Sequence, residues 1–208
     1  MPGIFITIEG IDGAGKTTQT RLLVGWLIGL GYGVCATREP GGTSAGERIR
    51  DLVLSREWAI PAEAELFLYL ADRTIHVSQV IRPALAADDV VVCERYTDST
   101  TAYQGHGRGL DLGFLRQLNE TATRGLLPDL TLVLDLPVNM ARLDEGRLDR
   151  LESEGRDFLA RVAAGFRELA EKEPGRVKLI DGSGEVQTVH GKMVAAVQRL
   201  LDEKGAGP

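Results

Sequence analysis

Two hydrophobic patterns alternate along the chain. Short runs of apolar, often β-branched residues predict buried strands at residues 4–9, 33–37, 90–93, 130–134 and 177–180. Between these runs, apolar residues recur every three or four positions, which predicts helices at 16–30, 44–54, 61–85, 110–124 and 186–201. A further helix, carrying Phe158 and Phe166, follows a charged stretch at 142–156. Pro83 is expected to bend or break the 61–85 helix.

Strands that alternate with helices predict βαβ crossovers and therefore a parallel sheet. The predicted fold class is α/β, with a five-stranded parallel sheet flanked by helices on both faces. No repeat or linker-like tract divides the chain, so a single domain is expected over residues 1–208. The residues from Asp202 onward are expected to form a disordered tail.

Composition narrows the class of protein. The 208 residues carry a net charge of −6, which argues against broad binding to nucleic acid. No apolar run reaches the roughly 18 residues needed to cross a bilayer, and no basic segment that would begin a signal peptide precedes the first strand. The only cysteines, Cys35 and Cys93, lie in apolar runs and are expected to be buried and reduced. These features favour a cytoplasmic protein without membrane or nucleic-acid partners.

The chain contains 25 glycines, about 12% of its 208 residues, whereas roughly 7% is usual. Their positions point to loops with special geometry. The first cluster falls between a predicted strand and a predicted helix and fits G-x-x-x-x-G-K-[ST], the phosphate-binding P-loop: Gly10, Ile11, Asp12, Gly13, Ala14, Gly15, Lys16 and Thr17. Such a loop directs backbone N–H groups at phosphate oxygens, while Lys16 reaches the β- and γ-phosphates and Thr17 can bind Mg²⁺. The sequence therefore predicts binding of a nucleoside triphosphate.

The P-loop alone leaves several classes open. The Asn-Lys-x-Asp motif that reads guanine in GTPases is absent. A kinase needs positive charge at both the donor and the acceptor phosphate, whereas an ATPase needs no second phosphate site. Arginines recur at or near the openings of predicted loops, and they suit phosphate oxygens: Arg38, Arg50, Arg73, Arg95, Arg142, Arg147 and Arg150. A kinase is favoured over an ATPase or a non-catalytic nucleotide-binding module.

The sequence resembles thymidylate kinase over nearly its whole length. The resemblance rests on EGIDGAGKTTQ at 9–19, TREPGGT at 37–43, ERY at 94–96, AYQGHGRG at 102–109, PDLT at 128–131, LD at 134–135 and DRLE at 149–152. It implies a P-loop kinase, usually a homodimer, that transfers the γ-phosphoryl group of MgATP to dTMP and gives dTDP. A kinase for another nucleoside monophosphate is the main alternative.

The resemblance also implies a role for individual residues. ATP would bind residues 10–17 with Thr18, and Arg142 would lie against adenine; Thr17 and Glu94 would hold Mg²⁺. Lys16, Asp12 and Arg95 would be catalytic, together with Arg142, Arg147 and Arg150 of a lid at about 142–152. The dTMP site would comprise Asp12, Arg38, Arg50, Tyr69, Arg73, Arg95, Ser99, Thr100, Tyr103 and Gln104.

The roles implied within that site are specific. Arg95, Arg38 and Arg50 would position the acceptor phosphate, Tyr69 would stack on thymine, and Arg73 and Gln104 would bond the edge of the base. Tyr103 would lie under the sugar and disfavour a ribose. The spacing of Tyr69 and Arg73, four residues apart in one predicted helix, supports their facing one ligand. Four features depart from the family. Glu94 stands where Asp is commoner, Tyr69 where Phe is usual and Phe166 where Tyr is common, and LDEG at 143–146 interrupts the arginines of the lid.

Overall fold

The computed structural model describes residues 3–141, 150–151 and 154–205. Its strands are β1 (Ile4–Gly10), β2 (Val34–Arg38), β3 (Val90–Glu94), β4 (Leu130–Asp135) and β5 (Val177–Asp181). The longer helices are α1 (Lys16–Gly29), α2 (Ser44–Leu54), α3 (Ala62–His76), α6 (Leu112–Thr123), α7 (Arg156–Lys172) and α8 (Val186–Glu203). Shorter helical segments are η1 (Val77–Ile81), α4 (Arg82–Ala86), α5 (Thr97–Thr100), η2 (Thr101–Gly107) and η3 (Val138–Met140).

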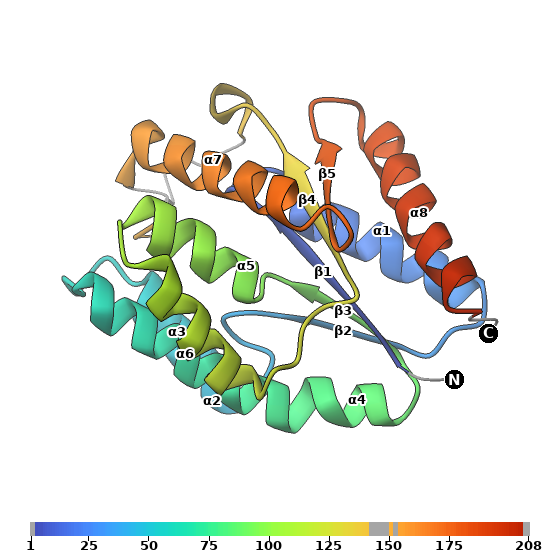
Figure 1. Cartoon of the computed structure of the whole chain (residues 1–208), viewed down its shortest axis with the longest axis horizontal. Coiled ribbons are helices and arrows are strands. Elements are labelled where there is room, and N and C mark those ends of the chain that lie inside the picture. Colours follow the sequence, from blue (N-terminus) through green and yellow to red (C-terminus); the bar gives the residue numbers. More distant parts are fainter. Residues whose placement is uncertain (1–2, 142–149, 152–153, 206–208) are drawn as a thin grey trace.

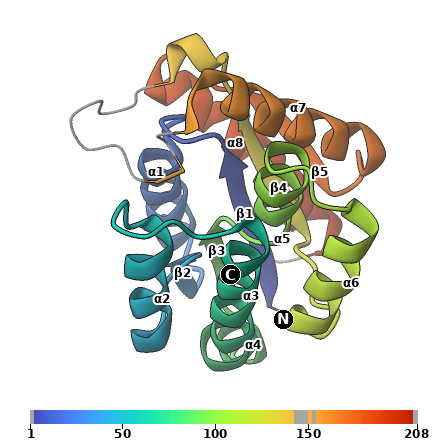
Figure 2. The same cartoon turned by 90° about the vertical axis from the view of Figure 1, so that its left-hand side faces the viewer.

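The five strands form one parallel sheet in the order β2-β3-β1-β4-β5 (Figure 1 and Figure 2), so the predicted fold class is confirmed. The register places Ile8 beside Glu94 and Arg38 beside Glu94 on successive strands. The carboxyl ends of the strands therefore meet along one edge of the sheet, where ligands of open α/β folds bind. The P-loop, the loop after β2 and the segment after β3 all begin at this edge.

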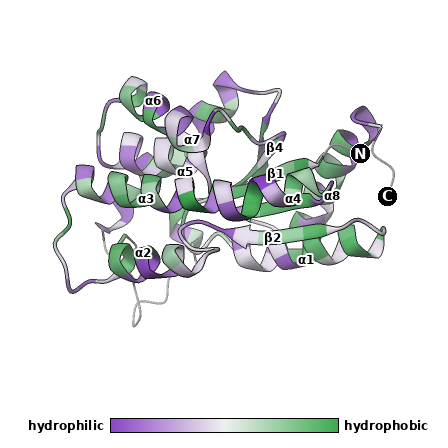
Figure 3. Cartoon of the chain, turned by 90° about the horizontal axis from the view of Figure 1, so that it is seen from below, coloured by the Kyte–Doolittle hydropathy of each residue, from purple (hydrophilic) through white to green (hydrophobic). Residues whose placement is uncertain are grey.

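Alternating residues of the central strands build two cores. Ile4, Ile6 and Ile8 of β1 face α1 and α8, where Leu23, Leu27 and Met193 are fully buried. Residues on the other face pack against the segments that contribute to the pocket: Phe5 and Val91 contact η1 and Tyr96, and Val133 contacts α7. Burial of β1, β3 and β4 on both faces explains their near-continuous apolar runs, and Figure 3 shows β1 as mostly apolar.

The helix predicted at 61–85 differs from expectation in where it is interrupted. It runs from Ala62 to Ala86, and the irregular part is a π-helical turn at Val77–Ile81. Pro83 lies just after this turn, near the start of α4. Because proline has no N–H to donate, a wider turn before it accommodates the missing bond and the helix continues.

Two other differences concern boundaries. Residues 97–107, between the predicted strand at 90–93 and the predicted helix at 110–124, form α5 followed by the π-helical η2. This stretch contains two glycines and three threonines and carries no helical apolar period, so no helix was predicted there. At the other end, α8 extends to Glu203, two residues into the predicted tail. Among the described residues, no helix is long and apolar enough to cross a membrane.

Candidate active site

The loop after β1 has the backbone geometry that its glycines allow. Gly15 immediately precedes α1 with φ of 89°, a left-handed conformation that is costly for other residues. At Gly10, with φ of 136°, a Cβ would lie 2.8 Å from the carbonyl oxygen of Leu134. The loop thus turns tightly from β1 into the N-terminus of α1, where backbone N–H groups and the helix dipole favour phosphate.

Lys16 is buried inside this loop. Its ammonium group donates hydrogen bonds to the carbonyl oxygens of Gly10 (3.1 Å) and Ile11 (2.8 Å). Burial is the largest influence on its pKa, and with the nearby charge of Arg95 it lowers that pKa from about 10.5 to about 8. The loop therefore holds a cation that its surroundings solvate poorly, and an anion brought beside it would be stabilised strongly.

Thr17 and Glu94 are brought together, although 77 positions separate them. The Thr17 hydroxyl donates a 2.9 Å hydrogen bond to Oε2 of Glu94, across the edge of the sheet between α1 and β3. A hydroxyl and a carboxylate oxygen are hard ligands of the type that Mg²⁺ prefers. No group of three or more His, Cys, Asp or Glu that could hold a metal alone occurs in the described ranges. A magnesium ion here would need nucleotide phosphates to complete its ligands.

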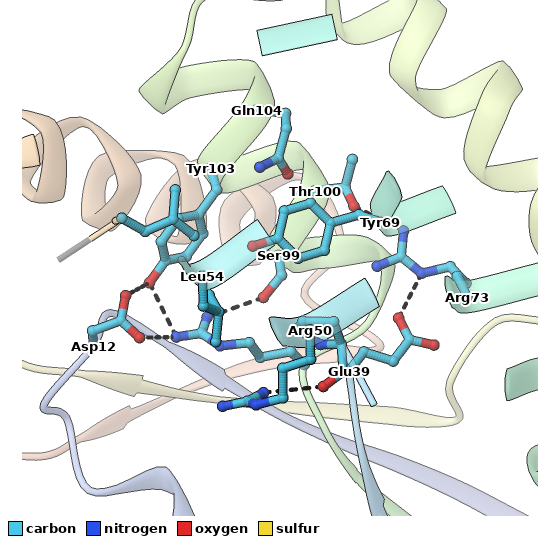
Figure 4. Close-up of a pocket in the computed structure, with 13 residues that line it drawn as sticks. Asp12, Glu39, Arg50, Leu54, Tyr69, Arg73, Ser99, Thr100, Tyr103 and Gln104 are labelled. Atoms are coloured by element: carbon cyan, nitrogen blue, oxygen red, sulfur yellow. Dashed lines mark hydrogen bonds and ion pairs between the residues drawn. The ribbon is translucent and has the colours of Figure 1, made fainter. Parts of the chain in front are cut away.

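Asp12, Arg95 and Tyr103 form a network beside the loop, and Figure 4 shows Asp12 and Tyr103 directed toward each other. The Arg95 guanidinium pairs with Asp12 and donates to the carbonyl oxygen of Gly10 and the hydroxyl of Tyr103, both at 3.2 Å. Tyr103 in turn donates to Asp12 at 2.7 Å. Burial alone would raise the pKa of Asp12, but the charges of Arg95 and Lys16 outweigh it and the pKa lies below its ordinary value. Asp12 is therefore held as a carboxylate.

Glu9, the last side chain of β1 before the loop, supports this network from below. Its carboxylate accepts from the backbone N–H of Tyr96 (2.7 Å) and Ser99 (3.2 Å) and from the Ser99 hydroxyl (2.5 Å). It thereby caps the short helix α5, which follows Arg95, a residue with φ of 66°. Burial raises the pKa of Glu9 to about 7, and Asp98 adds to the effect. Glu9 was not among the predicted site residues; the signal for it was a charged residue at the end of an otherwise apolar strand.

A pocket opens next to Asp12 and Arg95, with about 510 Å³ of space free of protein atoms, part of it open to solvent. The pocket brings together most of the predicted acceptor residues, and it adds four that the sequence did not suggest: Glu39, Pro40, Leu54 and Leu151. The predicted residues in the lining are Asp12, Arg50, Tyr69, Arg73, Arg95, Ser99, Thr100, Tyr103 and Gln104.

Tyr69 and Arg73 both face the pocket from α3, as their spacing predicted (Figure 4). The Arg73 guanidinium is almost fully buried and donates to Glu39 (2.8 Å), Thr100 (2.7 Å), Asn119 (2.6 Å) and the carbonyl oxygen of Tyr96 (2.9 Å). These bonds use four of its five N–H donors, and the hydrogen bonds of the described residues leave one donor, on Nη2. Arg73 is thus rigid, with one donor left for a ligand.

Arg38, at the end of β2, and Arg50, on α2, are placed differently. Arg50 lines the pocket and donates to the carbonyl oxygen of Pro40 at 3.0 Å. Arg38 does not line it: its half-exposed guanidinium pairs with Glu47 at 3.1 Å, beside a second, open hollow that Glu94 also lines. The structure therefore groups Arg50 with Arg95 and leaves Arg38 to one side.

The predicted lid is described only in part. Arg142 and Arg147 lie outside the described residues, as do Asp149 and Glu152. Arg150 is described: its Nε donates to the carbonyl oxygen of Val53 (2.9 Å), and its Nη2 lies 2.6 Å from Oε2 of Glu65. In this arrangement Arg150 connects the C-terminal end of α2 with α3.

The P-loop lies at the edge of a parallel sheet, and beside it is a pocket lined by arginine and aromatic side chains. This combination is typical of P-loop kinases that phosphorylate nucleotides. The sequence matches the thymidylate kinase family over residues 8–193. The thymidylate kinase of Desulfovibrio desulfuricans is 47% identical, over 98% of this chain and 99% of that protein. That of Leifsonia xyli is 52% identical, over 90% and 91%. The chain belongs to the thymidylate kinase family, which makes it a kinase that phosphorylates dTMP.

A solved structure agrees with this assignment. The crystal structure of thymidylate kinase from Ehrlichia chaffeensis superposes with a TM-score of 0.80 at 35% identity, and the match covers 95% of this chain and 99% of that one. The resemblance found in the sequence motifs is thus confirmed over nearly the full length.

Proposed function

We propose that the dTMP kinase reaction of this chain uses the P-loop for ATP and the pocket beside it for dTMP. The observation that carries this proposal is the contact of Asp12 with Arg95 and Tyr103, because it joins the P-loop to the pocket wall. The γ-phosphoryl group would pass from ATP to the dTMP phosphate across this junction. The product is dTDP.

On the donor side, ATP would bind to the backbone of residues 10–17 and to Thr18. Lys16 would exchange its bonds to the two loop carbonyls for the β- and γ-phosphates, a change favoured by its lowered pKa. Thr17 and Glu94 would hold Mg²⁺, which neutralises charge on the phosphates when bound. The resemblance assigns adenine contact to Arg142 and charge stabilisation to Arg142, Arg147 and Arg150.

On the acceptor side, the ring of Tyr69 would stack on the base, since an aromatic face suits any flat heterocycle. Arg73 offers a single N–H donor, and Gln104 offers an amide. Ser99 and Thr100 lie along the same wall. Tyr103 would lie under the deoxyribose, and its ring is fixed by edge contacts with Phe158 and Phe166.

The acceptor phosphate would lie near Arg95 and Arg50, the two arginines that share the pocket. Arg38, at the neighbouring hollow, would add charge from the side of Glu94. Asp12 would accept a hydrogen bond from the 3′-hydroxyl of dTMP, a role that requires the carboxylate form that its low pKa provides. Because phosphoryl transfer needs little covalent help from the protein, positioning and charge neutralisation would account for the catalysis.

We also propose a homodimer that forms through α3 and α6. These helices pack against each other through Leu66, Leu70 and Leu115. Their other faces expose Phe67 (54%) and Phe114 (47%), an unusual exposure for phenylalanine. Sedimentation should give a dimer for the wild type and a monomer for Phe114→Asp; a wild-type monomer would refute the proposed dimer.

We place the enzyme in the cytoplasm, consistent with its two free cysteines.

An acceptor panel tests the reaction itself. ADP release is measured with dTMP, dUMP, dCMP, dGMP and AMP, and with no acceptor. We expect clear preference for dTMP and little release without acceptor. ATP hydrolysis that is independent of an acceptor would instead favour the ATPase alternative, and preference for another monophosphate would favour a different substrate.

A further inference from the structure

A buried carboxylate, that of Glu65, lies behind the residues that line the pocket and bonds one of them, Gln104. Glu65 lies on α3, four residues before Tyr69, and is fully buried. Buried acids are rare unless paired, and an ion pair in a protein interior often adds little net stability. Its contacts therefore call for an explanation other than stability.

Four polar contacts surround this carboxylate. Oε1 accepts from Nε2 of Gln104 at 2.7 Å and from Nε of Arg108 at 3.4 Å. Oε2 lies 3.0 Å from Nη2 of Arg108 and 2.6 Å from Nη2 of Arg150. A carboxylate has about four lone-pair positions and no donor. That of Glu65 accepts three hydrogen bonds, one from Gln104 and two from Arg108, and forms an ion pair with Arg150.

This arrangement decides which way round the Gln104 amide lies. An amide has a donor end and an acceptor end of nearly equal size, and the same pocket could be served by either. Since the paired Glu65 carboxylate only accepts, it must be met by the NH₂ end of Gln104. The carbonyl oxygen is then the polar atom left for the pocket that Gln104 lines; Figure 4 shows the amide end of Gln104 directed toward the ring of Tyr69.

We propose that Glu65 is a positioning residue for base selection: it holds Gln104 as a hydrogen-bond acceptor toward the base. The inference rests on the proposed stacking of the base on Tyr69. An acceptor beside the single donor of Arg73 complements an N–H next to a carbonyl, which thymine and uracil present at N3 and O4. Cytosine presents the reverse pattern, a ring nitrogen without hydrogen next to an amino group.

The decisive variant is Glu65→Gln. Its amide both donates and accepts, so Gln104 is free to turn and present its NH₂ end to the base. We expect the ratio of kcat/KM for dTMP to that for dCMP to fall at least tenfold, with a parallel fall in the ratio of binding affinities measured by calorimetry. If Glu65 served only folding, its substitution would lower kcat/KM and affinity for dTMP and dCMP by the same factor, and the ratios would not change.

Controls separate orientation of the amide from loss of charge pairing. Arg108→Met removes a partner of Glu65 but leaves Gln104 bonded, and Glu63→Gln changes an exposed acid on the same helix; both should keep the wild-type ratio. If the Glu65→Gln protein does not fold, the double variant Glu65→Gln with Arg108→Met is used in its place, because it restores the local charge balance. Unchanged ratios in a folded Glu65→Gln protein, or an equal fall in Arg108→Met, would overturn the inference.

Gln104→Ala distinguishes failure of the inference from failure of the proposed site. If discrimination is lost in Gln104→Ala but kept in Glu65→Gln, the base lies where proposed and only the positioning role is wrong. If Gln104→Ala also keeps the wild-type ratio, the base does not contact Gln104, and both the placement of the base and the role of Glu65 are wrong.

Discussion

Binding of ATP to this protein should weaken above about pH 8, because Lys16 loses its charge far below the pH at which an exposed lysine does. Burial and Arg95 lower its pKa from about 10.5 to about 8. At roughly 1.4 kcal/mol per pH unit, keeping Lys16 charged costs about 3 kcal/mol in the substrate-free protein. Phosphate oxygens stabilise only the charged form, so the ATP-competent fraction is the protonated fraction.

The size of the effect follows from that fraction. One pH unit above the pKa, about a tenth of the molecules carry the charge, so the Kd for MgATP at pH 9 should be about tenfold higher than at pH 7. At pH 10 it should be about a hundredfold higher. Calorimetric titration of MgATP into enzyme without dTMP measures this directly, because no acceptor phosphate is present to shift the pKa of Lys16.

Glu9, Tyr69 and Tyr103 titrate mainly outside the range from pH 8 to 10. Glu9, with a pKa of about 7, is half ionised at pH 7 and almost fully ionised at pH 8, so its titration falls below most of the expected rise in Kd. Burial raises the pKa values of Tyr69 and Tyr103 above their ordinary value, so both phenols stay protonated. The shift of Lys16 also makes the folded state more stable as the pH rises from 8 to 10.5, since the unfolded chain binds the extra proton there. Loss of binding would therefore not follow from unfolding driven by Lys16.

Lys16→Arg is the matched control, because a guanidinium stays charged throughout this range. It should bind MgATP more weakly than wild type at pH 7 if its longer head fits poorly, but its Kd should not change between pH 7 and 9.5. A wild-type Kd that is constant within twofold over the same range would refute the reasoning, as would an equal rise in Lys16→Arg. Circular dichroism at each pH checks that the protein remains folded.

Three further substitutions test other parts of the structure. Arg95→Ala should lower kcat/KM for dTMP at least tenfold, or about 1.4 kcal/mol of transition-state stabilisation, whereas Arg199→Ala on the exposed face of α8 should not change it. Thr17→Ala should raise the Mg²⁺ concentration needed for half-maximal activity severalfold; an unchanged requirement would remove Thr17 from the metal site. Leu23→Ala, at a fully buried position of α1, should cost about 2–5 kcal/mol of stability and lower Tm by about 2–4 °C for each kcal/mol, and a shift below 2 °C would contradict its place in the core.

The sheet and its flanking helices could be predicted because their patterns are local. A strand buried on both faces reads as an apolar run, and α1 follows the P-loop signature directly. Residues 97–107 could not be predicted in the same way. The helix α5 begins because Glu9, some 87 positions earlier, accepts the Tyr96 N–H, and η2 is held by packing against α7. Such tertiary support leaves no period in the local sequence.

The candidate site divides along the same line. Residues on one contiguous motif, such as Lys16 and Thr17, were predicted from spacing and context. Which arginine lies in the pocket could not be predicted, because Arg38 directly follows a predicted strand, where ligand-binding residues are common, whereas Arg50 falls inside a predicted helix. Only the fold shows that Arg50 reaches the pocket whereas Arg38 is held by Glu47. Their proposed roles differ accordingly, with Arg50 closer to the acceptor phosphate.

Helix α3 carries both the residues that would contact the base and the residue that would orient Gln104. Glu65, Tyr69 and Arg73 stand at four-residue intervals, so they form one stripe along a single face. Tyr69 offers a surface that accepts any flat base, and Arg73 offers one donor whose position is fixed by four other bonds. Neither distinguishes a base by what its ring nitrogen carries. That distinction needs a hydrogen-bond acceptor with a fixed direction. The acceptor would be the carbonyl oxygen of Gln104, and Glu65 is the residue of the stripe that would fix its direction. A helix that looked in the sequence like a stacking and bonding platform thus also carries the residue that would orient its partner across the pocket.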